Sequence, residues 1–294
     1  MRWSLLLAVL CLVGTSHRSA VAQTSAETAS TLSSHEIRAL FNKVAEKDRE
    51  NNKLARAYTY IKRQEARNLG EKDQSKSVDS KTYEIMILYE DPVARQIAKD
   101  DKPLSAKDAA KEDEKIQKII DKRKNESEED RRKRLAKEEK EREESRKFVS
   151  EIAEAYEFQQ VGTESFEGRE TYVIDAEPKA GYEPHSKDAK FLTKFRFRIW
   201  IDKAESQWVK LDALSLDTVS FGLFLVRLHK GARVQVEQTR VNDEVWLPQH
   251  INLKVDAKVA LLKGFNMDID ITYRDYKKFH TDTKIVPGEE VTEK

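Results

Sequence analysis

Residues 265–274, FNMDIDITYR, alternate strictly between apolar and polar side chains. Residues 195–202, FRFRIWID, follow nearly the same rule. Because successive side chains of a β-strand point to opposite faces of its sheet, both stretches predict strands with one apolar and one wetted face. This pattern is typical of antiparallel sheets. The apolar face needs a cover, so the question of function becomes whether the protein's own helices or a ligand provides it.

Other segments extend this α+β pattern along the chain. Apolar residues at helical spacing from Ile37 to Val44 predict a helix over 34–52, which Ser33 and Glu36 begin with a capping box. Short links between the later strands favour an up-and-down meander. The expected strands are 57–65, 82–89, 93–97, 156–164, 171–176, 194–202, 207–218, 221–229, 232–241, 246–257 and 262–275.

A charged tract interrupts the strands. Between residues 107 and 147, 30 of 41 side chains are charged, 16 basic and 14 acidic. Glu, Lys, Arg and Ala favour helix, and opposite charges three or four residues apart support it. We therefore expect a long charged helical insertion over 105–155. It is either a solvated helical or partly disordered excursion, or a lid or partner-binding arm.

The N-terminal residues predict export. Arg2 precedes a short apolar run over 5–13, and Ala20-Val21-Ala22 forms a cleavage site, so 1–22 is expected to be a secretory signal peptide. The alternative is an uncleaved membrane anchor. Cleavage removes Cys11, the only cysteine, and an exported chain without disulfides fits the bacterial periplasm or cell envelope. We expect a flexible leader over 23–32 and a loose tail over 281–294.

No motif for catalysis or metal binding stands out. The sequence has 54 basic and 53 acidic residues, so no basic field indicates nucleic-acid binding. It contains no G-x-S-x-G, no glycine-rich phosphate loop and no H-E-x-x-H. We expect no enzyme activity, no cofactor and no metal. The histidines of the mature chain are scattered without ligand spacing, at His35, His185, His229, His250 and His280.

Four short stretches carry a family resemblance. They are 198–202 (RIWID), 243–248 (DEVWLP), 263–265 (KGF) and 273–279 (YRDYKKF). In this order the chain resembles envelope proteins of the LolA/LolB/RseB-like superfamily, and more narrowly the outer-membrane lipoprotein-sorting-like proteins, over about residues 35–280. The resemblance implies an incomplete antiparallel β-barrel over 33–280, with helices covering the concave face. It also implies a non-enzymatic carrier or sensor that holds lipid chains.

These observations lead to one main hypothesis, a periplasmic protein that binds a lipid, lipoprotein or other amphiphile in an apolar cleft. The alternative is an envelope interaction protein with a filled cavity, which docks a partner in stress sensing or assembly through 107–147. A hydrolase has no supporting feature. The tryptophans either pack at the core and rim or line the cleft. The expected lining residues are Ile199, Ile201, Phe265, Met267, Ile269 and Ile271, with Trp200 and Trp246.

Overall fold

A computed structural model of the protein describes residues 31–69, 75–89, 91–185, 188–221, 226–259 and 264–279. The expected signal peptide, nearly all of the expected leader and the expected tail lie outside these ranges. Leu32 is described, and it already packs beside the first helix. Its backbone N–H donates to Gln160 Oε1 over 2.7 Å.

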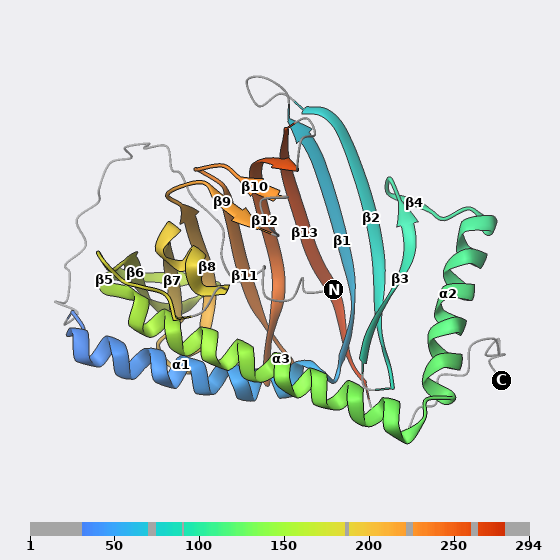
Figure 1. The fold of residues 1–294 in the computed structure, drawn as a ribbon, viewed down its shortest axis with the longest axis horizontal. Coiled ribbons are helices and arrows are strands. Elements are labelled where there is room, and N and C mark those ends of the chain that lie inside the picture. Colours follow the sequence, from blue (N-terminus) through green and yellow to red (C-terminus); the bar gives the residue numbers. More distant parts are fainter. Residues whose placement is uncertain are drawn as a thin grey trace.

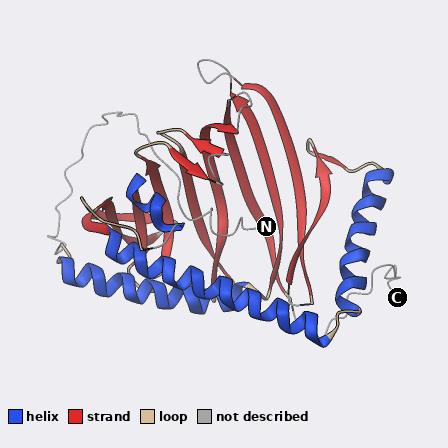
Figure 2. Ribbon diagram, in the orientation of Figure 1, coloured by secondary structure: helices blue, strands red, loops and turns tan. Residues whose placement is uncertain are grey.

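The fold is one open, curved antiparallel sheet of 13 strands with helices along one side (Figures 1 and 2). The strands agree closely with the predicted segments, because alternation of apolar and polar residues is a local property of each strand. They are β1 (Tyr58–Leu69), β2 (Ser75–Leu88), β3 (Asp91–Lys99), β4 (Lys102–Pro103), β5 (Tyr156–Phe166), β6 (Arg169–Pro178), β7 (Phe195–Asp202), β8 (Trp208–Ser215), β9 (Val219–Phe221), β10 (Val226–Leu228), β11 (Arg233–Val241), β12 (Val245–Val259) and β13 (Phe265–Lys278).

The strand order is β4-β3-β2-β1-β13-β12-β11-β8-β7-β6-β5, with β10 paired to β12 and to β9. Most neighbours are consecutive, as a meander predicts. The exceptions are the pairings of β8 with β11 and of β10 with β12, and the pairing of β1 with β13, which brings the first and last strands together in the middle of the sheet. The single strand expected over 221–229 is instead the two short strands β9 and β10, and 222–225 lie outside the described residues.

One row of paired residues defines the two faces of the sheet. It runs across seven strands as Ile174, Ile199, Leu211, Val236, Ile251, Ile271 and Gln64. Directly opposite residues in antiparallel strands point to the same side. We call the face that carries this row the inner face and the opposite one the outer face. The inner row is apolar from β6 to β13 and becomes polar at β1.

Helix α1 (Ser34–Ala55) covers part of the inner face. Ser33 and Glu36 form the predicted capping box. Ile37 and Val44 are buried against Ile199 and Ile201, in a cluster that also contains residues of β6 and β8. The apolar stripe of α1 is therefore used on the β5–β8 end of the sheet, where it completes the core.

The charged tract forms two helices, α2 (Ala106–Lys124) and α3 (Glu128–Ala155), which separate at residues 125–127. Ser105 and Ser127 accept hydrogen bonds at their N-termini. Helix α2 is held beside β3, where Glu112 Oε2 accepts from the backbone N–H of Gln96 over 3.0 Å. Ile116 is buried. Because α2 packs against the sheet edge, the first half of the tract is part of the domain.

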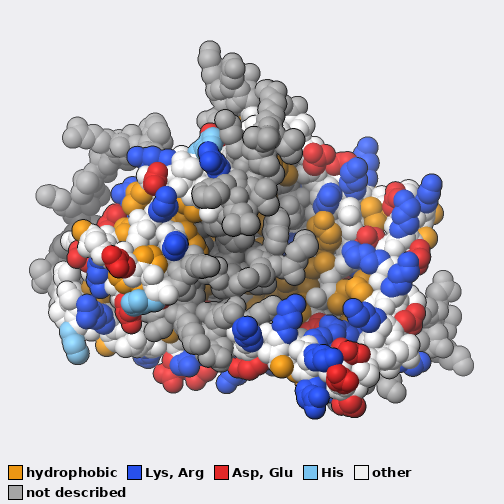
Figure 3. Space-filling view, in the orientation of Figure 1, with side chains coloured by type: hydrophobic (Ala, Val, Ile, Leu, Met, Phe, Trp, Pro, Cys, Tyr) orange, Lys and Arg blue, Asp and Glu red, His pale blue; other side chains and the backbone are white. Residues whose placement is uncertain are grey.

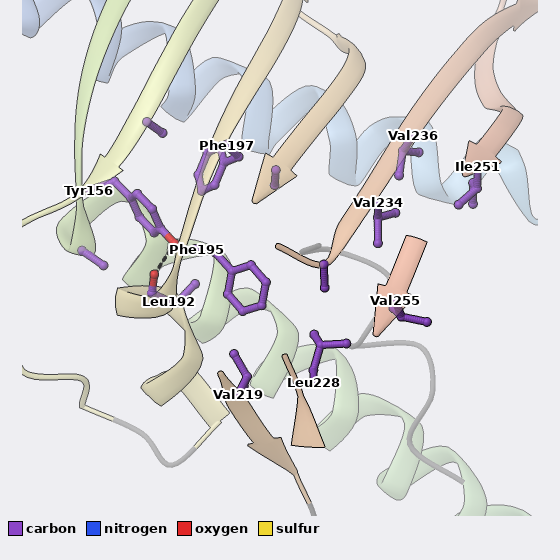
Figure 4. Close-up of a cluster of buried hydrophobic side chains, with 14 of the residues drawn as sticks. Tyr156, Leu192, Phe195, Phe197, Val219, Leu228, Val234, Val236, Ile251 and Val255 are labelled. Atoms are coloured by element: carbon purple, nitrogen blue, oxygen red, sulfur yellow. Dashed lines mark hydrogen bonds between the residues drawn. The ribbon is translucent and has the colours of Figure 1, made fainter. Parts of the chain in front are cut away.

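The largest hydrophobic cluster lies where the inner face meets the end of α3 and the 3₁₀ segment Asp188–Lys194 (Figure 4). Tyr156 is buried there and donates from its hydroxyl to the carbonyl oxygen of Leu192. Phe195 and Phe197 of β7 fill the space beside it. This end of the sheet is a packed core.

Candidate functional site

The expected lining residues separate into three groups in the structure. Ile199 and Ile201 lie on the inner face, but α1 covers them, and their exposed fractions are 8% and 0%. They are core residues at the filled end of the sheet. A ligand would have to displace α1 to reach them, so they do not lie on the accessible part of the inner face.

Met267, Ile269 and Ile271 lie on the inner face of β13 and are half-buried. Leu253 of β12 is directly opposite Ile269 and is also half-buried. We call these four residues the apolar floor. Phe265 begins β13, and its side chain lies outside the described residues. The role of these residues in ligand binding stays a prediction.

Trp200 and Trp246 lie on the outer face, away from the apolar floor. They share a small cluster with Val173 and Val209. Each indole N–H donates to a carboxylate, from Trp200 to Glu164 over 2.8 Å and from Trp246 to Glu205 over 3.0 Å. Trp200 follows Ile199 by one residue and so points to the opposite face, and Trp246 shares its cluster. Both tryptophans therefore lie on the other side of the sheet from Ile199, Ile201 and the apolar floor.

Four residues that sequence reasoning did not select adjoin the apolar floor. Lys62 is paired with Tyr83 on β2 and with Tyr273 on β13, which places all three side chains on the inner face. Tyr60 lies next to them, with its ring centroid 5.8 Å from that of Tyr273. The Lys62 Nζ atom is 5.0 Å from the centroid of the Tyr83 ring. We call these four residues the Tyr–Lys patch.

Burial shifts the ionisation of the patch. It lowers the pKa of Lys62, because it disfavours the charged ammonium. It raises the pKa of Tyr60, Tyr83 and Tyr273, because it disfavours the phenolate. In the described part of the chain, none of these four side chains forms a hydrogen bond or ion pair. Among the described residues, the patch is one cation with three free hydroxyls, and it lies where the inner face changes from the apolar β13 to the more polar β1.

The patch and the floor lie on the inner face of four neighbouring strands, β12, β13, β1 and β2. Figure 1 shows α1 and α3 crossing the strands near one end, with α2 beside β3. Among the described elements, no helix crosses the middle of β13, β1 and β2 in that view. Figure 3 shows hydrophobic side chains gathered between β1, β2 and α2, with basic side chains on the helices at their edge. The inner surface of these strands, whose middle no described helix crosses in Figure 1, is the candidate site.

The outer face offers a contrast, because its charges are satisfied by one another. Arg198 and Asp175 form a bidentate pair at 2.6 and 2.8 Å, and Arg233 binds Asp212 at 3.0 Å. A groove of about 370 Å³ lies over these residues. Mixed and mutually paired charges are typical of a solvated sheet face. We do not assign a ligand to this groove.

His250 contacts Asp270 over 2.7 Å in a cross-strand pair on the outer face. Within the residues that the structure describes, no group of three His, Cys, Asp or Glu side chains is arranged to hold a metal ion. None of the described helices combines the length and apolar character that crossing a membrane requires.

Comparison with known proteins gives structural neighbours only. No family model and no curated protein matches the sequence. A DUF1329 family protein from Desulfovibrio piger is 11% identical, with 84% of this chain and 95% of that chain covered and a TM-score of 0.30. A putative outer membrane lipoprotein-sorting protein domain from Vibrio parahaemolyticus is 12% identical, with 83% and 95% covered and a TM-score of 0.30.

A third solved structure, a LolA superfamily protein from Nitrosomonas europaea, is 11% identical, with 83% of this chain and 93% of that chain covered and a TM-score of 0.29. The names of these last two proteins agree with the family resemblance inferred from the sequence. At TM-scores near 0.3 the likeness adds no detail to the site, which rests on the strands and side chains described above.

Proposed function

We propose that this protein is a carrier or sensor of the bacterial periplasm that binds the acyl chain of a lipid, lipoprotein or similar amphiphile on the apolar floor. One observation supports the proposal most directly. Met267, Ile269 and Ile271 form a half-buried apolar row on the inner face, in the region that no described helix crosses. The expected signal peptide over 1–22 supports the location.

The free energy of burying an acyl chain on an open apolar surface is small enough for reversible binding. Each methylene removed from water contributes about 0.8 kcal/mol. A chain of about ten methylenes therefore gains roughly 8 kcal/mol before the cost of association and ordering, which is at least about 4 kcal/mol. Complete burial is not available on an open surface. The net gain is then about 4 kcal/mol or less, so we expect the chain alone to bind with a dissociation constant of about 1 mM or weaker, which allows both capture and release.

A neutral fluorescent probe tests this function. Methyl 11-(dansylamino)undecanoate carries an acyl chain without a charge, and its emission rises in an apolar environment. We expect the purified protein to bind it, and Ile269→Asp to weaken binding at least about tenfold, because the new carboxylate would be desolvated under the chain. Ile269 lies on the inner face opposite Ala66, and it is not itself part of the largest hydrophobic cluster, against which Met267, Ile271 and Leu253 pack.

The matched control places the same charge on the outer face of the same strand. Thr272→Asp introduces a carboxylate opposite Arg63 and His250, where it meets basic groups. We expect this variant to bind the probe like the unaltered protein. Equal binding by the Ile269 variant and the unaltered protein, or no binding by either, would refute the proposed site.

A further inference from the structure

The Tyr–Lys patch contains a charge without a partner. Lys62 lies on β1 between Tyr83 and Tyr273 and is half-buried. Lysines that are removed from water are normally paired with a carboxylate or extend their ammonium to the surface. Among the described residues, the Lys62 ammonium has a cation–π contact with the ring of Tyr83 and no ion pair. The inner face therefore holds an unmatched positive charge.

Glu112 of α2 does not fill this role. It is close enough to influence Tyr83, but its carboxylate already accepts from the Gln96 backbone N–H over 3.0 Å and from Lys115 over 3.1 Å. The remaining members of the patch, beside Lys62, are three tyrosines. Tyrosine hydroxyls are protonated at neutral pH, and burial raises the pKa of Tyr60 and Tyr273 further, so their hydroxyls are available as hydrogen-bond donors.

We propose that the Tyr–Lys patch receives the anionic headgroup, a carboxylate or a phosphate, of an amphiphile whose chain lies on the apolar floor. This inference rests on the proposed function and names the chemical class of the ligand. The Lys62 ammonium supplies the charge, and the hydroxyls of Tyr60, Tyr83 and Tyr273 supply hydrogen bonds.

The spacing of residues along β13 suits a ligand with its headgroup on the patch and its chain on the apolar floor. Tyr273 is two residues beyond Ile271 on the same face of β13, which corresponds to a separation of about 7 Å along the strand. A headgroup beside Tyr273 can therefore extend its chain directly over Ile271 and Ile269. The ligand would lie along β13, with its polar end toward the end of β13 that also carries Tyr276.

A pair of probes that differ only in the headgroup charge tests the inference. 11-(Dansylamino)undecanoate has the same chain and fluorophore as its methyl ester but carries a carboxylate. We expect the unaltered protein to bind the acid about tenfold more tightly than the ester, as one charge-assisted contact predicts. In Lys62→Met this preference should disappear while ester binding is retained. Lys62→Arg, which keeps the charge, should retain most of the preference.

Lys254→Met is the matched control, because it removes one exposed lysine from the outer face, where Lys254 is opposite Asp268. It should keep the preference for the acid. Circular dichroism should show that all three variants are folded. Acetate in large excess carries the carboxylate without a chain and should displace neither probe.

Each other result overturns the inference in an identifiable way. Equal affinity of the unaltered protein for acid and ester, with both bound, refutes the headgroup assignment and leaves the proposed function standing. An acid preference that persists in Lys62→Met also refutes it. Displacement of the acid by acetate would show a simple anion site in place of an amphiphile site. Absence of binding by both probes removes the proposed function and this inference together.

Discussion

Replacing Arg169 by methionine should destabilise the protein through a single buried carboxylate. The Asp202 side chain is 1% exposed and that of Arg169 is 32% exposed. The guanidinium binds Asp202 in bidentate geometry, with Nε–Oδ2 at 2.7 Å and Nη2–Oδ1 at 3.0 Å. The backbone N–H of Glu205 donates to the same carboxylate over 2.7 Å. The variant leaves Asp202 buried with only the hydrogen bonds from the backbone of Ala204 and Glu205.

The magnitude follows from this geometry. Removing one partner of a buried ion pair costs about 3–5 kcal/mol. Water reaches the partly exposed guanidinium position and the Glu205 N–H remains, so we expect the lower value, about 3 kcal/mol. For a domain of this size that lowers the midpoint of thermal unfolding by about 6–12 °C. A loss of about 3 kcal/mol is a large share of a typical free energy of unfolding, which is about 5–15 kcal/mol.

The assay is urea unfolding followed by tryptophan fluorescence, with two comparison variants. Lys203→Met breaks an exposed pair on the same turn, since Lys203 is 29% exposed but its partner Glu170 is 66% exposed, and it should cost less than about 1 kcal/mol. Arg169→Met combined with Asp202→Asn removes the buried charge and should recover about half of the loss. A cost for Arg169→Met no larger than that of Lys203→Met would refute the reasoning.

The same pair predicts a pH dependence with a definite sign. Burial raises the pKa of Asp202, but hydrogen bonds from Arg169 and from the Glu205 backbone outweigh it, so the pKa lies below the ordinary 3.8. The stabilisation by Asp202 is therefore complete above the unfolded-state pKa and is lost as the pH falls through the lower folded-state pKa. Without Arg169 burial dominates and the pKa rises. The stability difference between the two proteins should then shrink as the pH falls from 7 toward 4.

Two further predictions concern the covered end of the sheet. Ile201→Ala should lower the free energy of unfolding by about 2–5 kcal/mol, because it opens a cavity under α1 at a residue with 0% exposure, and chemical denaturation measures the loss. Ser33→Ala should cost about 1 kcal/mol by removing the capping box of α1, and Ser33→Thr should restore most of it in the same assay.

The motif residues behind the family resemblance turn out to be structural. Asp202 ends the RIWID stretch and Trp246 lies within DEVWLP. Both meet at Arg169, which binds Asp202 and lies with its Cζ atom 5.4 Å from the centroid of the Trp246 ring. The sequence pattern placed these two stretches in or beside the predicted strands 194–202 and 246–257. It could not show that they form one corner, because residues 169, 202 and 246 are brought together only by the pairing of strands.

The sequence predicted only part of the candidate site, again because it shows the pattern of one strand and not which strands are neighbours. Met267, Ile269 and Ile271 were identified because alternation on one strand shows which residues share a face. Lys62 was missed because β1, with the sequence YTYIKRQEARNL, does not alternate between apolar and polar residues. The sequence did carry a signal, because β1 has polar residues such as Lys62 and Gln64 on the face where β13 has apolar ones. This difference could be interpreted only once β1 was known to lie beside β13.

The sequence by itself determined the period of each segment, and with it the strands, the capped helix α1 and the apolar side of β7 and β13. These are consequences of short-range geometry, in which a side chain's direction depends on its neighbours along the chain. Only the tertiary structure decided that β1 pairs with β13, that α1 fills one end of the inner face, and that Lys62 faces the apolar floor. Those arrangements depend on contacts between residues some 200 positions apart, whose free energy is shared among many side chains and is not encoded in any single segment.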